Sequence, residues 1–180
     1  MRFTLAAATA AALLPTAAFA VDYMSADAAA KQIFPDADRI ELRDWQLDAA
    51  QVQGIASMGV RPRSTRWSLR LAYKGAELLG VVVADEVLGK FELISYAVGV
   101  AADGRLKGIE VMSYRESHGQ EIRLPAWRRQ FVGKTLAAPI RIGDDIANIS
   151  GATLSCSHVA EGVKRILAVV EQARRSGQLG

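Results

Sequence analysis

Four short runs with the character of β-strands follow one another in the middle of the chain, and only short turns separate them. The first run alternates polar and apolar side chains, as a half-buried strand does, and the second contains three consecutive valines, as fully buried strands often do. Parallel strands need a crossover of a dozen or more residues, which is longer than any connection here. The sequence therefore predicts an antiparallel β-meander. The four runs are residues 66–73, 78–84, 91–100 and 106–114.

The turns between these runs carry their own signals. Lys74-Gly75 follows the first run, and Asp103-Gly104 lies between the last two. Asp and Gly both tolerate a positive φ, so Asp103-Gly104 predicts a hairpin with a type I′ turn.

Short helices are expected before and after the meander. Residues 25–34 are rich in alanine, and Ser25 is a suitable N-cap. Residues 125–131 begin with a proline, which is favoured at the first position of a helix. Residues 47–64 contain two glycines and a proline, so we expect an irregular segment there with room for one helical turn.

The last element is a longer amphipathic helix over residues 157–175. Its apolar side chains recur at spacings of three and four, so that they form one face for packing on the sheet. Gly177 has the position of a C′ residue. We therefore expect residues 21–180 to form one α+β domain, an antiparallel meander packed against helices. The apolar face consists of Val159, Val163, Ile166, Val170 and Ala173.

Residues 1–20 have the pattern of a cleaved secretory signal. A single basic residue, Arg2, precedes an apolar stretch over residues 3–14, and Ala18 and Ala20 form an A-x-A cleavage site. The stretch is shorter than the ~20 apolar residues that a membrane-spanning helix needs. We predict cleavage after Ala20 and a secreted, periplasmic protein; an uncleaved N-terminal anchor is the alternative.

The charge balance argues against a nucleic-acid partner. The chain has 22 basic and 19 acidic residues, a net charge of +3, and the predicted signal contains one of the basic residues. Nucleic-acid-binding domains have a stronger basic excess. The single cysteine, Cys156, cannot form an intramolecular disulfide, and with two histidines it offers no ligand spacing for a metal or haem site. We therefore expect no nucleic acid and no bound metal.

The segment before the long helix has the composition of a phosphate-binding turn. Residues 148–155, Asn-Ile-Ser-Gly-Ala-Thr-Leu-Ser, bring small side chains and hydroxyls to the predicted helix start. The N–H groups and the dipole at a helix N-terminus attract anions. A turn that only caps the helix would have a similar composition, so these residues alone leave both interpretations open.

Residues 150–155, Ser-Gly-Ala-Thr-Leu-Ser, resemble the S-G-A-T-[LIV]-[ST] signature of the FMN-binding domain family. That family includes the flavin-carrying subunits of the sodium-translocating NADH:quinone reductase and of the Rnf complex. Three further segments are similar to the family in the same order. They are an Asp-Gly turn within residues 101–108, a strand end followed by Glu-Ser-His-Gly at residues 116–119, and an aromatic helix followed by Gly-Lys over residues 127–134. The resemblance spans residues 72–170.

This resemblance implies a flavoprotein whose FMN is joined to Thr153 by a phosphoester. It also implies membrane or periplasmic redox proteins as electron donor and acceptor, and an exported flavin transferase that uses FAD and Mg²⁺ for the modification. We expect an electron-transfer carrier rather than a stand-alone enzyme. A module that binds FMN non-covalently, or a degenerate interaction module, is the alternative. The family commonly has an Asp six residues before the threonine, where this chain has Ala147.

The cofactor-binding residues expected from the resemblance fall into two groups. Backbone N–H groups and hydroxyls around the threonine would bind the phosphate. After the strand end, polar residues would approach the polar edge of the flavin ring, and two apolar side chains would cover its face. Core packing is the alternative for Trp127, and an exposed loop position is the alternative for His118. The groups are Ser150, Gly151, Ala152, Thr153, Leu154 and Ser155, and Glu116, Ser117, His118, Gly119, Leu124 and Trp127.

A nucleophilic enzyme is the main rival hypothesis from the residues themselves. Ser155, Cys156 and His158 lie close together in the sequence. Residues two apart on a helix point to different faces, so Cys156 and His158 do not form a pair. The chain also lacks a G-x-S-x-G nucleophile elbow. We therefore predict no catalytic residues, and we interpret Cys156 as a small buried side chain.

Overall fold

The computed structural model describes residues 23–179, so the predicted signal over residues 1–20 lies outside the described residues. A five-stranded antiparallel sheet forms the centre, with its strands in the order β1-β2-β3-β4-β5. The predicted meander is therefore confirmed, and it has one strand more than expected. The strands are β1 (Arg39–Gln46), β2 (Arg66–Lys74), β3 (Glu77–Leu88), β4 (Leu93–Ala101) and β5 (Leu106–Ser113).

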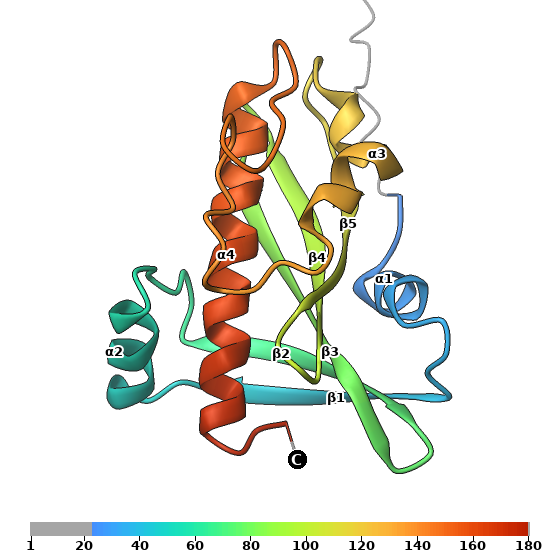
Figure 1. The fold of residues 1–180 in the computed structure, drawn as a ribbon, viewed down its shortest axis with the longest axis vertical. Helices are drawn as coiled ribbons and strands as arrows, with labels where there is room; N and C mark the ends of the chain where they lie inside the picture. The colour runs from blue at the N-terminus through green and yellow to red at the C-terminus, as the bar shows by residue number, and fades with distance from the viewer. Residues whose placement is uncertain (1–22, 180) are drawn as a thin grey trace, which may run out of the picture.

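Helices cover both faces of this sheet, as Figure 1 shows. Helix α4 (Thr153–Arg175) packs on one face, mainly against β3 and β4, and α1 (Ala26–Ile33) packs on the other. Two apolar cores result, a large one under α4 and a small one under α1. The α+β class and the meander packed against helices are thus confirmed.

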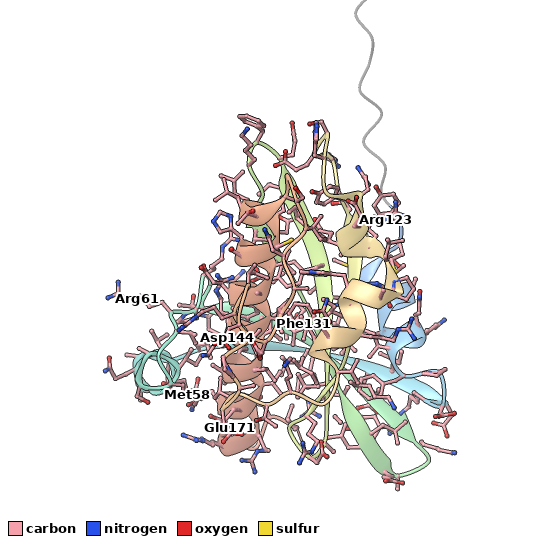
Figure 2. The ribbon with its side chains drawn as sticks, turned by 45° about the horizontal axis from the view of Figure 1, so that its top comes forward. Met58, Arg61, Arg123, Phe131, Asp144 and Glu171 are labelled. Carbon is pink, nitrogen blue, oxygen red and sulfur yellow. The ribbon has the colours of Figure 1, made fainter. Side chains whose placement is uncertain are left out.

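The interior is filled by side chains from the sheet, from α4 and from the segment after β5. Figure 2 shows Phe131 among these inner side chains, whereas Arg61 extends away from the molecule. Phe131 is fully buried and belongs to the large core. Because this core continues along the length of α4, it anchors both ends of that helix.

The strand that sequence reasoning missed is β1, which pairs with β2 along its whole length, from Arg39 opposite Tyr73 to Gln46 opposite Arg66. Trp45 is the buried side chain of this strand, and charged residues occupy most of the others. The strand starts with an alternation of polar and apolar residues at Arg39–Leu42, but this alternation breaks at Arg43-Asp44, so the apolar side chains do not share one face. Charged side chains are common on edge strands because they discourage pairing with another chain.

The hairpin at Asp103-Gly104 is present, but the prediction of a type I′ turn is wrong. Gly104 has a φ of +84°, whereas Asp103 does not adopt a positive φ. The Asp103 carboxylate accepts a hydrogen bond from the Arg105 N–H at 3.0 Å. The Gly104 N–H donates to the Ala101 carbonyl at 2.8 Å. This is the pattern of a longer hairpin loop in which a left-handed glycine follows the turn.

Two of the three short helical predictions hold. Ser25 caps α1, since its Oγ accepts a hydrogen bond from the Ala28 N–H at 3.2 Å. Helix α3 (Pro125–Arg128) begins with proline as predicted and continues into the 3₁₀ turn η2 (Arg129–Phe131). A further 3₁₀ turn, η1 (Gln120–Arg123), precedes α3.

The third prediction, an irregular segment over residues 47–64, is wrong for its first half. Residues Ala49–Ser57 form the nine-residue helix α2 beside α4. Asp48 and Gln51 form a capping box, with side-chain-to-backbone hydrogen bonds of 2.8 and 3.0 Å. These bonds satisfy backbone groups at the helix start and outweigh the cost of the internal Gly54.

Helix α4 confirms the predicted amphipathic helix but starts earlier, at Thr153 rather than at residue 157. The whole predicted apolar face is buried. At the other end, Gly177 has a φ of +67° and the Gln178 N–H donates to the Ala173 carbonyl at 2.8 Å, which is a Schellman motif. Within residues 23–179, none of the helices combines the length and the apolar character that a bilayer span requires.

Candidate functional site

A cavity of about 420 Å³ lies at the N-terminal end of α4. That volume is within the range of small-molecule sites. Three segments far apart in the sequence line it: the β3–β4 turn, the loop after β5, and the start of α4. In Figure 1 the loop after β5 and the loop that leads into α4 lie beside the upper end of α4. The lining residues are Lys90, Phe91, Glu116, Ser117, His118, Gly151, Ala152, Thr153, Leu154 and Ser155.

The start of α4 has backbone donors that the helix does not use. The N-cap is Ala152, which has no side chain able to cap, and the Cys156 N–H makes the first hydrogen bond to it, at 2.9 Å to the Ala152 carbonyl. The N–H groups of the first helical residues have no acceptor within the helix. The structure therefore does not have the Ser- or Thr-capped start that was the alternative interpretation of this segment.

Thr153 is the first residue of α4 and its side chain is exposed at the cavity. The Asn148 side-chain amide donates a hydrogen bond to Thr153 Oγ1 at 2.9 Å. This bond fixes the hydroxyl oxygen as an acceptor and leaves its own proton for transfer. Sequence reasoning did not select Asn148 as a site residue; the signal is a side-chain amide in the turn just ahead of a helix start.

The loop after β5 is held against α4 by buried contacts. Tyr114 is buried, and its hydroxyl donates to the His118 carbonyl and lies 3.4 Å from Ser155 Oγ. Burial raises the pKa of Tyr114, so this hydroxyl stays a donor over the ordinary pH range. Ser155 is itself buried, and its Oγ is thus occupied by the packing between the loop and the helix.

Glu116 joins this loop to the β3–β4 turn. Its Oε1 accepts hydrogen bonds from the Phe91 N–H at 2.6 Å and from the Glu92 N–H at 3.0 Å. Burial raises the pKa of the Glu116 carboxyl, but backbone hydrogen bonds from Glu92, Phe91 and Lys90 lower it by more, so its pKa lies below the ordinary value. The carboxylate is therefore charged and engaged with the protein backbone.

The other predicted residues of this loop lie in different settings. Ser117 and His118 are exposed at the cavity, and Ser117 Oγ is 2.9 Å from His118 Nδ1. Gly119 is buried behind the lining and contacts Ala152. Ser150 is exposed in the loop before α4, and Leu124 is exposed at the N-cap of α3; neither residue lines the cavity.

Trp127 packs in the core, which was the alternative to a position over the flavin ring. It is buried, and its ring packs edge-on against Phe131 with centroids 5.0 Å apart. Its Nε1 donates to the Ala147 carbonyl at 2.8 Å, and the Ala147 N–H donates to Gln130 Oε1 at the same distance. Trp127 therefore fixes the loop that leads to Thr153 and does not line the cavity.

The carboxylates nearest to Ala147 do not replace the aspartate common in the family. Asp145 pairs with Lys134 at 2.8 Å and accepts hydrogen bonds from the N–H groups of Arg141 and Ile140. Burial raises the pKa of Asp145, and these partners together lower it by more, to below its ordinary value. Asp144 is exposed beside α4 in Figure 2. Neither residue lines the cavity.

Cys156 and His158, which the rival hypothesis of a nucleophilic enzyme would use, do not form a catalytic pair in the structure. Cys156 is fully buried, and burial raises the pKa of its thiol, which disfavours the reactive thiolate. His158 Nδ1 bonds to the Leu88 carbonyl. The chemistry that this geometry supports is the binding of an anionic group at the start of α4, beside the Thr153 hydroxyl.

Comparison with known proteins agrees with this geometry. Residues 89–168 match the model of a family described as the FMN-binding domain. This segment of the chain belongs to the FMN-binding domain family. The matched segment contains the β3–β4 turn, the loop after β5 and the first turns of α4. All three walls of the cavity thus lie within the FMN-binding domain.

Solved structures share the fold. NqrC from Shewanella oneidensis is 18% identical with a TM-score of 0.58, and the match covers 81% of this chain and 88% of that chain. A Na(+)-translocating NADH-quinone reductase subunit from Parabacteroides distasonis is 16% identical with a TM-score of 0.52, covering 76% and 77% respectively. Among curated proteins, no sequence matches significantly.

The residues present fit FMN. Free N–H groups and a helix N-terminus suit its phosphate, and the exposed side chains of Phe91 and Leu154 suit an apolar ring. Lys90 and Phe91 were not selected from the sequence: Phe91 was assigned to a predicted strand over residues 91–100, and Lys90 lay in the connection before it. In the structure β4 begins at Leu93, so both residues belong to the turn.

Proposed function

We propose that this chain is an exported flavoprotein that carries FMN through a phosphoester to Thr153 and passes electrons between redox partners. The observation that carries the proposal is the position of Thr153. Its exposed hydroxyl is the first side chain of an uncapped helix, inside the cavity of an FMN-binding domain. A hydroxyl in that position can be esterified without disturbing the core.

The chain's own residues would hold the phosphate and orient the attachment point. The first N–H groups of α4 would donate to the phosphate oxygens, and the helix dipole would favour their negative charge. Asn148 keeps Thr153 Oγ1 directed by its 2.9 Å hydrogen bond. Trp127 and Gln130 hold the Ala147 backbone and so fix the approach of the loop. The flavin ring, when bound, supplies the redox chemistry.

The attachment needs a partner enzyme. In the proposed step, Thr153 Oγ1 forms a bond to the FMN phosphorus of FAD, the pyrophosphate bond breaks, and AMP leaves. The hydroxyl proton is lost to a base of the transferase. We propose that this transferase uses FAD and Mg²⁺ and acts after export, and that the electron donor and acceptor are membrane or periplasmic redox proteins. The predicted signal over residues 1–20 supports this location.

Intact-mass spectrometry tests the attachment. The chain is coexpressed with a flavin transferase and a supply of FAD, and its mass is expected to rise by one FMN less one water. Thr153→Val removes the hydroxyl and should abolish the gain. Thr65→Val, at an exposed threonine outside the FMN-binding segment, should keep it. An unmodified wild-type chain under these conditions contradicts the covalent proposal.

A non-covalent FMN module remains the second candidate, and Ala147 in place of the common aspartate is the observation that favours it. Denaturation separates the two cases. Flavin that stays with the precipitated protein is bound covalently, whereas flavin released to the supernatant identifies the non-covalent module.

A further inference from the structure

The β3–β4 turn brings Lys90 to the cavity, and the buried Glu116 carboxylate is bonded to the backbone of this turn. Glu116 is only 7% exposed, and its Oε1 accepts from two successive N–H groups of the turn, at 2.6 and 3.0 Å. Two donors on one carboxylate oxygen fix the turn in both position and orientation. The carboxylate belongs to the loop after β5, so the bonds join segments that are remote in sequence.

The turn fits closely against this carboxylate. A Cβ added to Gly89 would lie 2.4 Å from Glu116 Oε1, so the turn can approach only because this residue is glycine. The Gly89 N–H donates to the Glu92 carbonyl at 2.8 Å and closes the turn. On the side of α4, His158 Nδ1 bonds to the Leu88 carbonyl. The loop after β5 and helix α4 therefore both hold the turn through hydrogen bonds.

Two side chains that this turn carries point to a ligand. Phe91 is 72% exposed although it lines the cavity, and Lys90 Nζ lies 4.8 Å from the centroid of its ring. Covering an exposed aromatic ring with a flat apolar ligand is favourable. An ammonium group beside the same ring stabilises negative charge on that ligand.

Resting on the proposed function, we propose that Glu116 is a positioning residue: it fixes the β3–β4 turn so that Phe91 and the Lys90 ammonium face the bound flavin. Lys90 then favours the reduced, more negatively charged ring and raises the midpoint potential. Glu116 acts through this turn and makes no contact of its own with the reacting atoms.

The first test uses the apoprotein and needs no flavin. Trypsin cleaves after Lys90, and cleavage requires local opening of the turn. Glu116→Ala removes both hydrogen bonds, so we expect cleavage there to accelerate about tenfold or more. Glu116→Gln keeps an acceptor oxygen and should restore most of the protection. Cleavage after Lys107, on β5, is the reference within each digest.

Equal cleavage after Lys90 in the wild type and Glu116→Ala would overturn the proposal. If Glu116→Ala does not fold, Gly89→Ala is used in its place. Its added Cβ would displace the Glu116 carboxylate from the turn, so it should also accelerate cleavage after Lys90. The experiment also separates the two proposals. A wild-type chain without the FMN mass gain contradicts the covalent attachment alone, while the tryptic result still decides the role of Glu116.

The second test measures the potential of the flavin-loaded protein. Lys90→Gln should make the midpoint potential more negative; a tenfold change in the equilibrium constant of two-electron reduction is about 30 mV. In Glu116→Ala, the direction of the change in midpoint potential distinguishes a direct effect of the Glu116 charge from an effect through Lys90. If Glu116 acted through its own charge, its removal would raise the potential, whereas loss of the Lys90 position lowers it. A rise in Glu116→Ala, or no change in Lys90→Gln, overturns the proposal.

Discussion

At the scale of single residues, Gly119 is the point where the loop after β5 meets the start of α4. Its φ is +87°, and an added Cβ would lie 2.2 Å from the Ala152 Cβ and 2.6 Å from the Tyr114 hydroxyl oxygen. Two separate reasons thus require glycine. The left-handed backbone disfavours a side chain, and the neighbouring atoms leave no space for one.

Gly119→Ala is therefore expected to destabilise the protein beyond the cost of the backbone conformation. Gly133→Ala is the matched control, because Gly133 has a φ of +81° and no atom within 4 Å of an added Cβ. We expect a loss of about 1 kcal/mol in the control and about 2–4 kcal/mol in Gly119→Ala. Urea unfolding measures both. Equal losses would show that the contact with Ala152 relaxes without cost.

At the scale of elements, strands with a sustained alternation or a continuous apolar run were predictable, and the edge strand was not. Strands β2 to β5 have apolar runs long enough to identify, whereas β1 is an edge strand with one buried side chain, Trp45. Its pairing with β2 comes from tertiary structure, which no local pattern contains. For α2, the capping box of Asp48 and Gln51 was the available signal.

The parts of the candidate site that lie within one short segment of the sequence were predictable. The segment with Thr153 and the loop with Glu116 were selected because their motifs resemble those of the FMN-binding domain family, and the structure brings both to one cavity. Lys90 and Phe91 reach that cavity only through the pairing of β3 with β4 and through the bonds to Glu116. The bonds to Glu116 join segments that are remote in sequence, so the residues of the turn alone do not predict them.

A largely buried ion pair connects α4 to the sheet, and it gives a prediction at this scale. Arg165 on α4 lies 2.8 Å from Asp85 on β3, and the buried Tyr96 hydroxyl donates to the same carboxylate at 3.1 Å. Removing Asp85 leaves Arg165 with little exposure and without this partner. Asp85→Ala should therefore cost about 3 kcal/mol.

Glu41→Ala is the comparison for this prediction. It breaks the Arg39–Glu41 pair, whose side chains are about half exposed, and it should cost less than about 1 kcal/mol. The free energies of unfolding of both variants can be measured in urea. A loss in Asp85→Ala as small as that in Glu41→Ala would mean that Arg165 finds solvent or another partner when its carboxylate is removed.

At the scale of the whole molecule, three carboxylates in different regions make stability depend on pH. Glu116 holds the β3–β4 turn, Asp145 holds the loop before α4, and Glu171 pairs with Arg174 and Arg175 near the end of that helix. Burial raises the pKa of Glu171, and its two arginine partners lower it by more. For all three groups the pKa in the folded protein lies below the ordinary value.

A lowered pKa means that the unfolded chain binds these protons more readily, so protonation favours unfolding. The stabilisation is complete above the ordinary carboxyl pKa and is lost as the pH falls through the lower pKa of the folded state. We expect the thermal midpoint to stay nearly constant from pH 7 to about 5 and to decline below about pH 4.

Asp145→Asn provides the control within the same series, because it cannot be ionised. It should be less stable than the wild type at pH 7, and the difference should shrink as the pH falls below about 4, where the wild-type carboxylate is also neutralised. Thermal melts of both proteins across this range measure the difference. A constant difference at every pH would show that Asp145 stabilises the loop through shape and neutral hydrogen bonds, and that its charge contributes nothing to the fold.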